Sequence, residues 1–177
     1  MIFKVVVCKL HFMKFSFLVL FTFLYQVSFA QNTIKADAEV MGKALVTKDY
    51  NAYISYTYPK LMKDMGGRDK MTETIKKQMD DLEKQGIKIL SITYGEPSVI
   101  IKEKQELQAT LPQEMQFQTA DGKVKARTTI IAISQDDGKH WYFVDPGERD
   151  LETVRISLPN LSRKLVLPPS EPVKMEK

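Results

Sequence analysis

The chain has 177 residues, 44% of them hydrophobic, with 26 Lys and Arg against 22 Asp and Glu and a formal net charge of +4. This length is enough to bury one sizeable core without covalent staples. The basic excess is poor support for nucleic-acid binding, because no run of Lys or Arg is longer than a pair, whereas nucleic-acid-binding domains usually carry a clustered basic face.

The N-terminal thirty residues have the layout of a secretory signal peptide. Lys14 supplies a positive start, residues 15–24 are mostly apolar, and a small-x-small cleavage site ends at Ala30. A membrane span is a poorer interpretation, because charged residues interrupt the run of about 20 apolar residues that a span needs. The sequence therefore predicts a signal peptide over 1–30, with Met13 as the true start and cleavage after Ala30.

Removal of the signal peptide changes the cysteine content and the net charge of the chain. Cys8 is the only cysteine, so the mature chain, residues 31–177, has no disulfide, no thiol nucleophile and no thiolate metal site. The leader also removes three lysines and no acids, which leaves 23 basic against 22 acidic residues. We expect an exported protein, periplasmic or secreted, without a transmembrane segment after cleavage and without nucleic acid as a partner.

Helices are predicted at the start of the mature chain. Ile34, Ala38, Met41 and Leu45 recur at helical spacing and predict a helix from residue 34. A second segment follows and is limited by Pro59, since the residue before proline avoids the helical region. A third helix is expected over residues 68–85, ended by Gly86, and a short one over 150–157.

After Gly86 the apolar period changes from about 3.6 to 2, which indicates strands. The expected strands cover residues 87–94, 98–102, 107–111 (stopped by Pro112), 124–134 and 140–144. Asp121-Gly122 and Asp137-Gly138 are hairpin turns, so the neighbouring strands should be antiparallel. One domain is expected over residues 31–162, followed by an extended, Pro-containing tail over 163–177.

Helices placed before a meander predict an α+β fold. Three stretches carry a more specific resemblance: YPKLMKDMGG (58–67), ISQDDGKHWYFVD (133–145) and LPNLS (158–162). With this order of elements, the chain resembles the nuclear-transport-factor-two-like superfamily, which includes ketosteroid isomerases and SnoaL-like cyclases, and within it small exported proteins of Bacteroidetes-type bacteria. The resemblance implies N-terminal helices packed in the concave face of a curved antiparallel sheet, a cone-like, cystatin-like α+β roll that can hold an apolar pocket.

Few residues of the mature chain offer chemistry. His140 is its only histidine and lies beside the Asp136-Asp137 turn, so an exposed rim position is more probable than a catalytic base. The two aspartates suit a turn better than an oxygen cage for a cation. No glycine-rich phosphate loop occurs. We therefore assign no catalytic residue, no metal ligand and no cofactor.

The resemblance implies a cone pocket whose walls would come from the aromatic residues of the helices and strands, although such residues more often serve packing. The candidates are Tyr53, Tyr56, Tyr94, Phe117, Trp141 and Phe143. An isomerase of the ketosteroid type would also need a carboxylate, for which Glu96 and Asp145 are candidates.

Three functions stay open from the sequence. The favoured hypothesis is a non-catalytic binding domain that holds a small apolar ligand or a protein partner, or forms a homodimer through the sheet. The alternatives are a small-molecule isomerase or hydrolase, and a structural accessory protein of the envelope.

Overall fold

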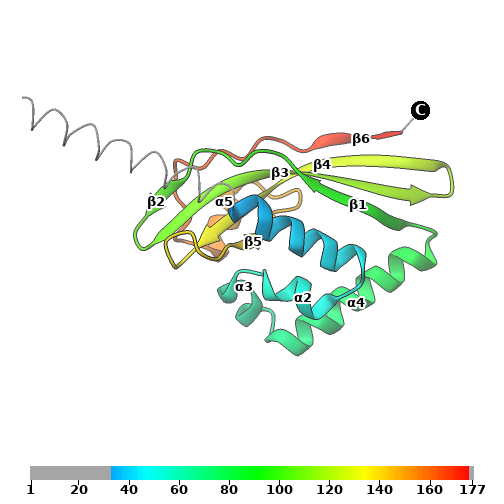
Figure 1. The fold of residues 1–177 in the computed structure, drawn as a ribbon, viewed down its shortest axis with the longest axis horizontal. Helices are drawn as coiled ribbons and strands as arrows, with labels where there is room; N and C mark the ends of the chain where they lie inside the picture. Colours follow the sequence, from blue (N-terminus) through cyan, green and yellow to red (C-terminus); the bar gives the residue numbers. More distant parts are fainter. Residues whose placement is uncertain (1–32, 176–177) are drawn as a thin grey trace, which may run out of the picture.

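The computed structural model describes residues 33–175, in which helices precede a curved, unclosed antiparallel sheet (Figure 1). The predicted fold class is confirmed: α+β, with N-terminal helices packed against the concave face of a cone-like sheet. The predicted signal peptide and its cleavage site lie outside the described residues.

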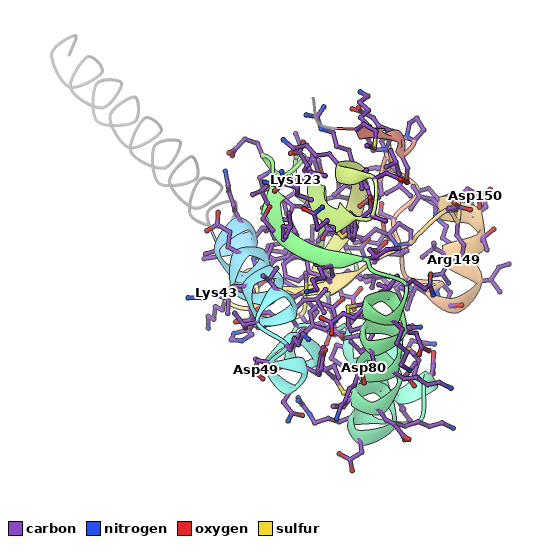
Figure 2. All side chains as sticks on the ribbon, turned by 90° about the vertical axis from the view of Figure 1, so that its right-hand side faces the viewer. Lys43, Asp49, Asp80, Lys123, Arg149 and Asp150 are labelled. Carbon is purple, nitrogen blue, oxygen red and sulfur yellow. The ribbon has the colours of Figure 1, made fainter. Side chains whose placement is uncertain are left out.

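Four helical segments form the N-terminal layer. Residues 33–46 are helical and are followed by α2 (Tyr50–Ser55), α3 (Pro59–Asp64) and α4 (Arg68–Lys84). The first helix, residues 33–46, buries Ile34, Ala38 and Met41 as the apolar spacing predicts. Charged side chains such as Lys43, Lys123 and Asp150 are exposed at the periphery (Figure 2).

The sequence does not predict α3, because Pro59 is expected only to limit the helix before it. In the structure α2 ends at Ser55, yet Pro59 is also the first residue of α3. Proline is tolerated there because the first N–H groups of a helix have no intrahelical acceptor. Gly66 and Gly67, with φ of 92° and 93°, then separate α3 from α4.

Two long central strands organise the sheet. The strands are β1 (Lys88–Tyr94), β2 (Ile101–Glu103), β3 (Glu106–Thr119), β4 (Gly122–Ser134), β5 (Tyr142–Val144) and β6 (Glu171–Met175). β3 and β4 pair from one end to the other, while β1 and β2 share the outer edge of β3, and β5 and β6 share that of β4. Every one of these pairings is antiparallel, and the Asp-Gly turns predict this for β3 with β4 and for β4 with β5.

The expectation that Pro112 stops a strand is wrong. β3 continues through Pro112, which pairs with Thr129 of β4. The Pro112 carbonyl accepts from the backbone N–H of Gly95, so the missing N–H of proline points toward the same edge of β3. At this point β1 has ended and β2 has not begun, so no ladder hydrogen bond is lost.

Two further boundaries differ from expectation. The strand predicted over 140–144 begins at Tyr142, because the backbone N–H of His140 still donates to the Asp136 side chain of the preceding turn (2.9 Å). The sequence also does not predict β6, since the Pro-containing tail is expected to run extended without pairing to the sheet. β6 nevertheless pairs with β4 near Val124 and Arg127.

Alternate residues of the sheet face two separate cores. We call the face toward the first helix the inner face; its core contains Ala109, Leu111, Ile130, Ala132, Trp141 and Phe143. On the outer face, residues of β4 and β5 pack against α5 (Leu151–Ser157) and the segment after it. That core contains Ile131, Ile133, Val144, Val154, Leu158, Leu161 and Leu165. Near β5 the sheet is therefore covered on both sides.

Candidate functional site

Five of the six predicted pocket residues gather in the inner core. Tyr94, Trp141 and Phe143 are buried there, and Tyr53 and Tyr56 pack against them. Phe117 lies apart, where it pairs with Ile89 of β1 and Val124 of β4. The aromatic residues thus form packed interior at this position, and of these five only Tyr94 also lines the groove considered below.

Hydrogen bonds from Trp141 join the sheet to the first helix. Its backbone N–H donates to Asp37 Oδ2 (2.9 Å) and its indole Nε1–H donates to Thr33 Oγ1 (3.0 Å). The Thr33 hydroxyl in turn donates to the carbonyl of Gly138 (3.0 Å). Burial raises the pKa of Asp37, although the N–H of Trp141 opposes the shift. The side chain of Trp141 is fully buried and acts as an anchor of the fold.

No described hydrogen bond joins the candidate tyrosines to Glu96 or Asp145, the carboxylates that an isomerase would use. Burial, and next the charge of Asp145, raises the pKa of Tyr53 to about 12. The Tyr94 hydroxyl is buried and has no partner among the residues that the structure describes. Asp145 is exposed and accepts from the backbone of Gly147, while exposed Glu96 pairs with Lys35 (2.8 Å). This arrangement does not favour acid–base catalysis.

His140 is exposed, as the rim interpretation predicts. Asp136 accepts hydrogen bonds from the Ser134 hydroxyl (2.8 Å) and the His140 backbone, and Asp137 adopts a positive φ of 58°. The two aspartates therefore build the turn. Within residues 33–175 no group of three or more His, Cys, Asp or Glu side chains is placed to hold a metal ion.

A buried polar network that the sequence does not predict joins the three stretches that carry the family resemblance. Glu106 accepts hydrogen bonds from Tyr58 (2.7 Å), Gln135 (2.8 Å) and Gln108 (3.1 Å). Gln108 also donates to the Asn160 carbonyl and accepts from the backbone N–H of Ser162.

Glu106 and Gln108 alternate with apolar residues in β3, so the sequence suggests that both face solvent. The segment after α5 covers this face instead, and the network fixes that segment to the sheet. The network is satisfied by its own donors, and it is best explained as structural.

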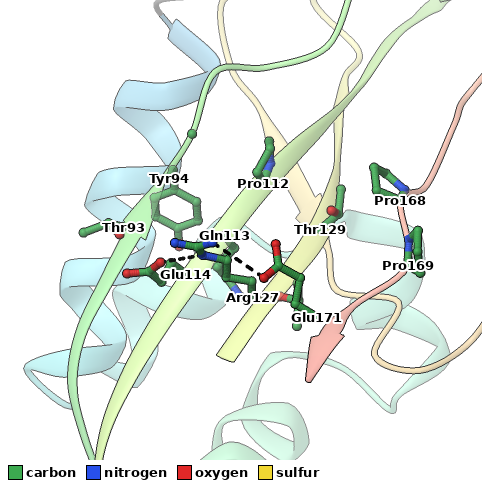
Figure 3. Close-up of a pocket in the computed structure, with 12 residues that line it drawn as sticks. Thr93, Tyr94, Pro112, Gln113, Glu114, Arg127, Thr129, Pro168, Pro169 and Glu171 are labelled. Carbon is green, nitrogen blue, oxygen red and sulfur yellow. Dashed lines mark hydrogen bonds and ion pairs between the residues drawn. The ribbon is translucent and has the colours of Figure 1, made fainter. Parts of the chain in front are cut away.

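A groove of about 410 Å³ lies between the sheet and the C-terminal segment (Figure 3). Its walls come from the end of β1, the middle of β3 and β4, and the residues leading into β6. Tyr94, Pro112, Pro168 and Pro169 supply apolar surface, and Thr129 adds a hydroxyl group. Three strands and a distant tail are needed to build this groove, so no single stretch of sequence indicates it.

Charge is concentrated on one side of the groove. Arg127 Nε lies 2.7 Å from Glu114 Oε2, whereas Arg127 Nη1 lies 3.6 Å from Glu171 Oε2 (Figure 3). Lys125 also contacts Glu114 (3.3 Å), and Lys174 contacts Glu171 (2.8 Å). These five residues, which we call the Arg127 cluster, contain three cations and two carboxylates. Hydrogen bonds from Arg127 and Lys125 lower the pKa of Glu114, and Lys174 lowers that of Glu171.

Comparison with known proteins finds likenesses among solved structures. No family model matches the chain, and no curated protein matches it. A solved structure from Catenulispora acidiphila has a TM-score of 0.44 and 13% identity, covering 70% of this chain and 93% of that chain. A likeness of that size carries no argument about function, so membership of the nuclear-transport-factor-two-like superfamily stays a prediction. No helix within the described residues is long and apolar enough to cross a membrane.

Proposed function

We propose that this protein is an exported, non-catalytic binding domain that holds a small carboxylate-bearing molecule in the groove beside Arg127. The observation that carries the proposal is the unequal engagement of Arg127. It is tightly paired with Glu114 at 2.7 Å, but its contact with Glu171, which comes from the C-terminal segment, is long at 3.6 Å. On its Nη1 side, the Arg127 guanidinium can therefore exchange Glu171 for another carboxylate.

The charges favour an anion as the ligand. Arg127 places a guanidinium in the wall of the groove, where it can pair with an anion. A guanidinium presents paired donors that match the two oxygens of a carboxylate. The contact between Arg127 and Glu171 is solvent-exposed, and such pairs contribute little to stability, so a ligand can replace Glu171 at small cost.

The uncharged walls of the groove favour a ligand that is compact and apolar apart from its carboxylate. The volume of about 410 Å³ falls within the range of roughly 300–1,000 Å³ that small-molecule sites occupy. Pro112, Pro168 and Pro169 offer rigid apolar contact. The lowered pKa values of Glu114 and Glu171 keep both groups ionised near neutral pH, which opposes a role as proton donor.

The test compares benzoate with benzamide, which differ in charge and share their shape, by titration calorimetry on the full chain. Benzoate should bind and benzamide should not. Arg127→Gln should abolish binding, and Glu171→Gln should strengthen it by removing the internal competitor. Lys60→Gln, which breaks an exposed ion pair with Asp64 elsewhere, is the matched control and should change nothing. Equal binding of the two probes, or equal effects of Arg127→Gln and Lys60→Gln, would refute the proposal.

Export and homodimer formation belong to the same proposal and rest on sequence. Fractionation of cells that express the full chain, followed by N-terminal sequencing, should find an exported protein beginning at Gln31. Native mass spectrometry of that protein reports both the subunit count and any co-purified acid.

A further inference from the structure

Residues 166–175, which we call the strap, lie along the sheet and bury little surface. The residue before them, Leu165, is buried in the outer core. Beyond it the described side chains are exposed apart from Leu167, which is half-buried against the same core. Val173 and Met175 of β6 are 64% and 54% exposed. A segment with so few buried apolar contacts opens locally at a low cost in free energy.

The pairing of β6 with β4 is also short and irregular. Its register shifts between Lys125 and Arg127, and residue 172 is a proline, which has no N–H to donate to a neighbouring strand. The ion pair between Lys174 and Glu171 lies within β6, so it does not attach the strand to the sheet. The contact between Arg127 and Glu171 does reach the sheet, but it is 3.6 Å long and joins two exposed side chains. The contact that a groove ligand would replace therefore also helps to hold β6 in place.

The strap is at the same time part of the groove. Pro168 and Pro169 form one wall, and Glu171 follows them at the start of β6, facing Arg127 (Figure 3). Only Ser170 separates the two rigid prolines from Glu171. Glu171 Oε2 lies on the Nη1 side of the guanidinium, so a carboxylate that binds on that side has to move the start of β6.

We propose that the strap is an autoinhibitory element of the groove, and that a carboxylate binding at Arg127 releases β6 from β4. The inference rests on the proposed function, since the ligand is the small carboxylate-bearing molecule described above. Glu171 and the ligand compete for one guanidinium, so the bound strap weakens ligand binding by the same factor by which the ligand weakens the binding of the strap. Occupancy of the groove is thereby transmitted to the C-terminal strand.

Amide hydrogen exchange of the full chain tests the release of β6. Benzoate should speed exchange at residues 173–175 by about 5-fold, the lower end of typical coupling between sites, and benzamide should leave it unchanged. Glu171→Gln should speed exchange there without any ligand, because it removes the charge that pairs with Arg127. Glu83→Gln is the matched control, because it breaks an exposed ion pair with Lys48 elsewhere, and it should have no effect on β6.

A disulfide that locks β6 onto β4 provides a second test. Val124 and Met175 are directly opposite in the antiparallel pair, where Cα atoms lie about 4.5–5.5 Å apart, within the span of a disulfide. The variant carries Val124→Cys and Met175→Cys together with Cys8→Ser, which removes the one native thiol. Its oxidised form should bind benzoate about 5-fold more weakly than its reduced form, which serves as the control for the substitutions themselves.

Three results would overturn the inference and leave the proposed function intact. They are unchanged or slower exchange of β6 in a chain that binds benzoate, equal effects of Glu171→Gln and Glu83→Gln on that exchange, and equal benzoate affinities of the oxidised and reduced forms. Absence of benzoate binding in calorimetry would instead refute the proposed function and this inference together, so the two failures are distinguishable.

Discussion

Gly42 allows a prediction whose sign opposes the usual rule. It is buried in the first helix, where replacing glycine by alanine normally stabilises a protein by about 0.8–1.0 kcal/mol. A Cβ at this position, however, would lie 2.8 Å from Tyr94 Oη, 3.0 Å from Tyr94 Cε2 and 3.3 Å from Ile92 Cβ. Overpacking of this kind costs about 1–3 kcal/mol. Gly42→Ala should therefore destabilise the protein by about 1 kcal/mol.

Urea unfolding followed by the fluorescence of Trp141 measures this effect. With a slope of about 2 kcal/mol per molar urea, the midpoint should fall by roughly 0.5 M. Ala36→Gly, at an exposed position of the same helix, calibrates the helix propensity without steric contact.

A double-mutant cycle identifies the cause. Tyr94→Phe removes the closest clashing atom and also a buried hydroxyl without a described partner, so on its own it should be neutral or stabilising. In that background Gly42→Ala should cost at least about 0.5 kcal/mol less than in the unmodified chain. If Gly42→Ala stabilised the protein by about 1 kcal/mol in both backgrounds, the close approach of Tyr94 to the helix would be refuted.

Two further predictions concern buried polar groups. Tyr58→Phe deletes a donor to Glu106 and should cost about 1.5–3 kcal/mol in urea unfolding, as hydrogen bonds to charged groups do; an unchanged midpoint would contradict the network. The pKa of Asp37 is raised above 3.8 in the folded state, so folded Asp37 holds its proton more tightly than unfolded Asp37 does. Ionised Asp37 therefore lowers the free energy of unfolding at neutral pH, and this cost vanishes in acid, where Asp37 is protonated in both states. Asp37→Asn, which keeps an acceptor for Trp141, should raise the urea midpoint at pH 7 and leave it unchanged near pH 3.

Local patterns in the sequence predict most of the architecture. The apolar spacing from Ile34 and the Asp121-Gly122 turn each depend on nearby residues, and the structure confirms both elements. Pro59 and Pro112 were harder to interpret because the effect of a proline depends on its neighbours in space. At the first position of α3 and at the gap between β1 and β2, neither proline loses a hydrogen bond.

The candidate sites could be predicted only in small part. Five of the six aromatic candidates lie close together and pack as core, whereas Phe117 lies apart. Glu106 and Gln108 follow an alternation that predicts exposure, and only the distant segment near Asn160 buries them. The Arg127 groove depends on the pairing of β6 with β4, two segments that are far apart in the sequence. Pairings between distant residues have no local signal in one sequence.

The split edges of the sheet have a consequence for solubility. β3 and β4 are the only long strands within the described residues, and they pair with each other. The outer edge of β3 pairs with two short strands, β1 and β2, and the outer edge of β4 pairs with β5 and β6. The strands left at the borders have between three and seven residues, and β1 contains a register shift between Ile89 and Ser91. Short, irregular borders are poor templates for strands of other molecules. A chain built this way can expose β-structure to a crowded compartment with little tendency to form fibrils.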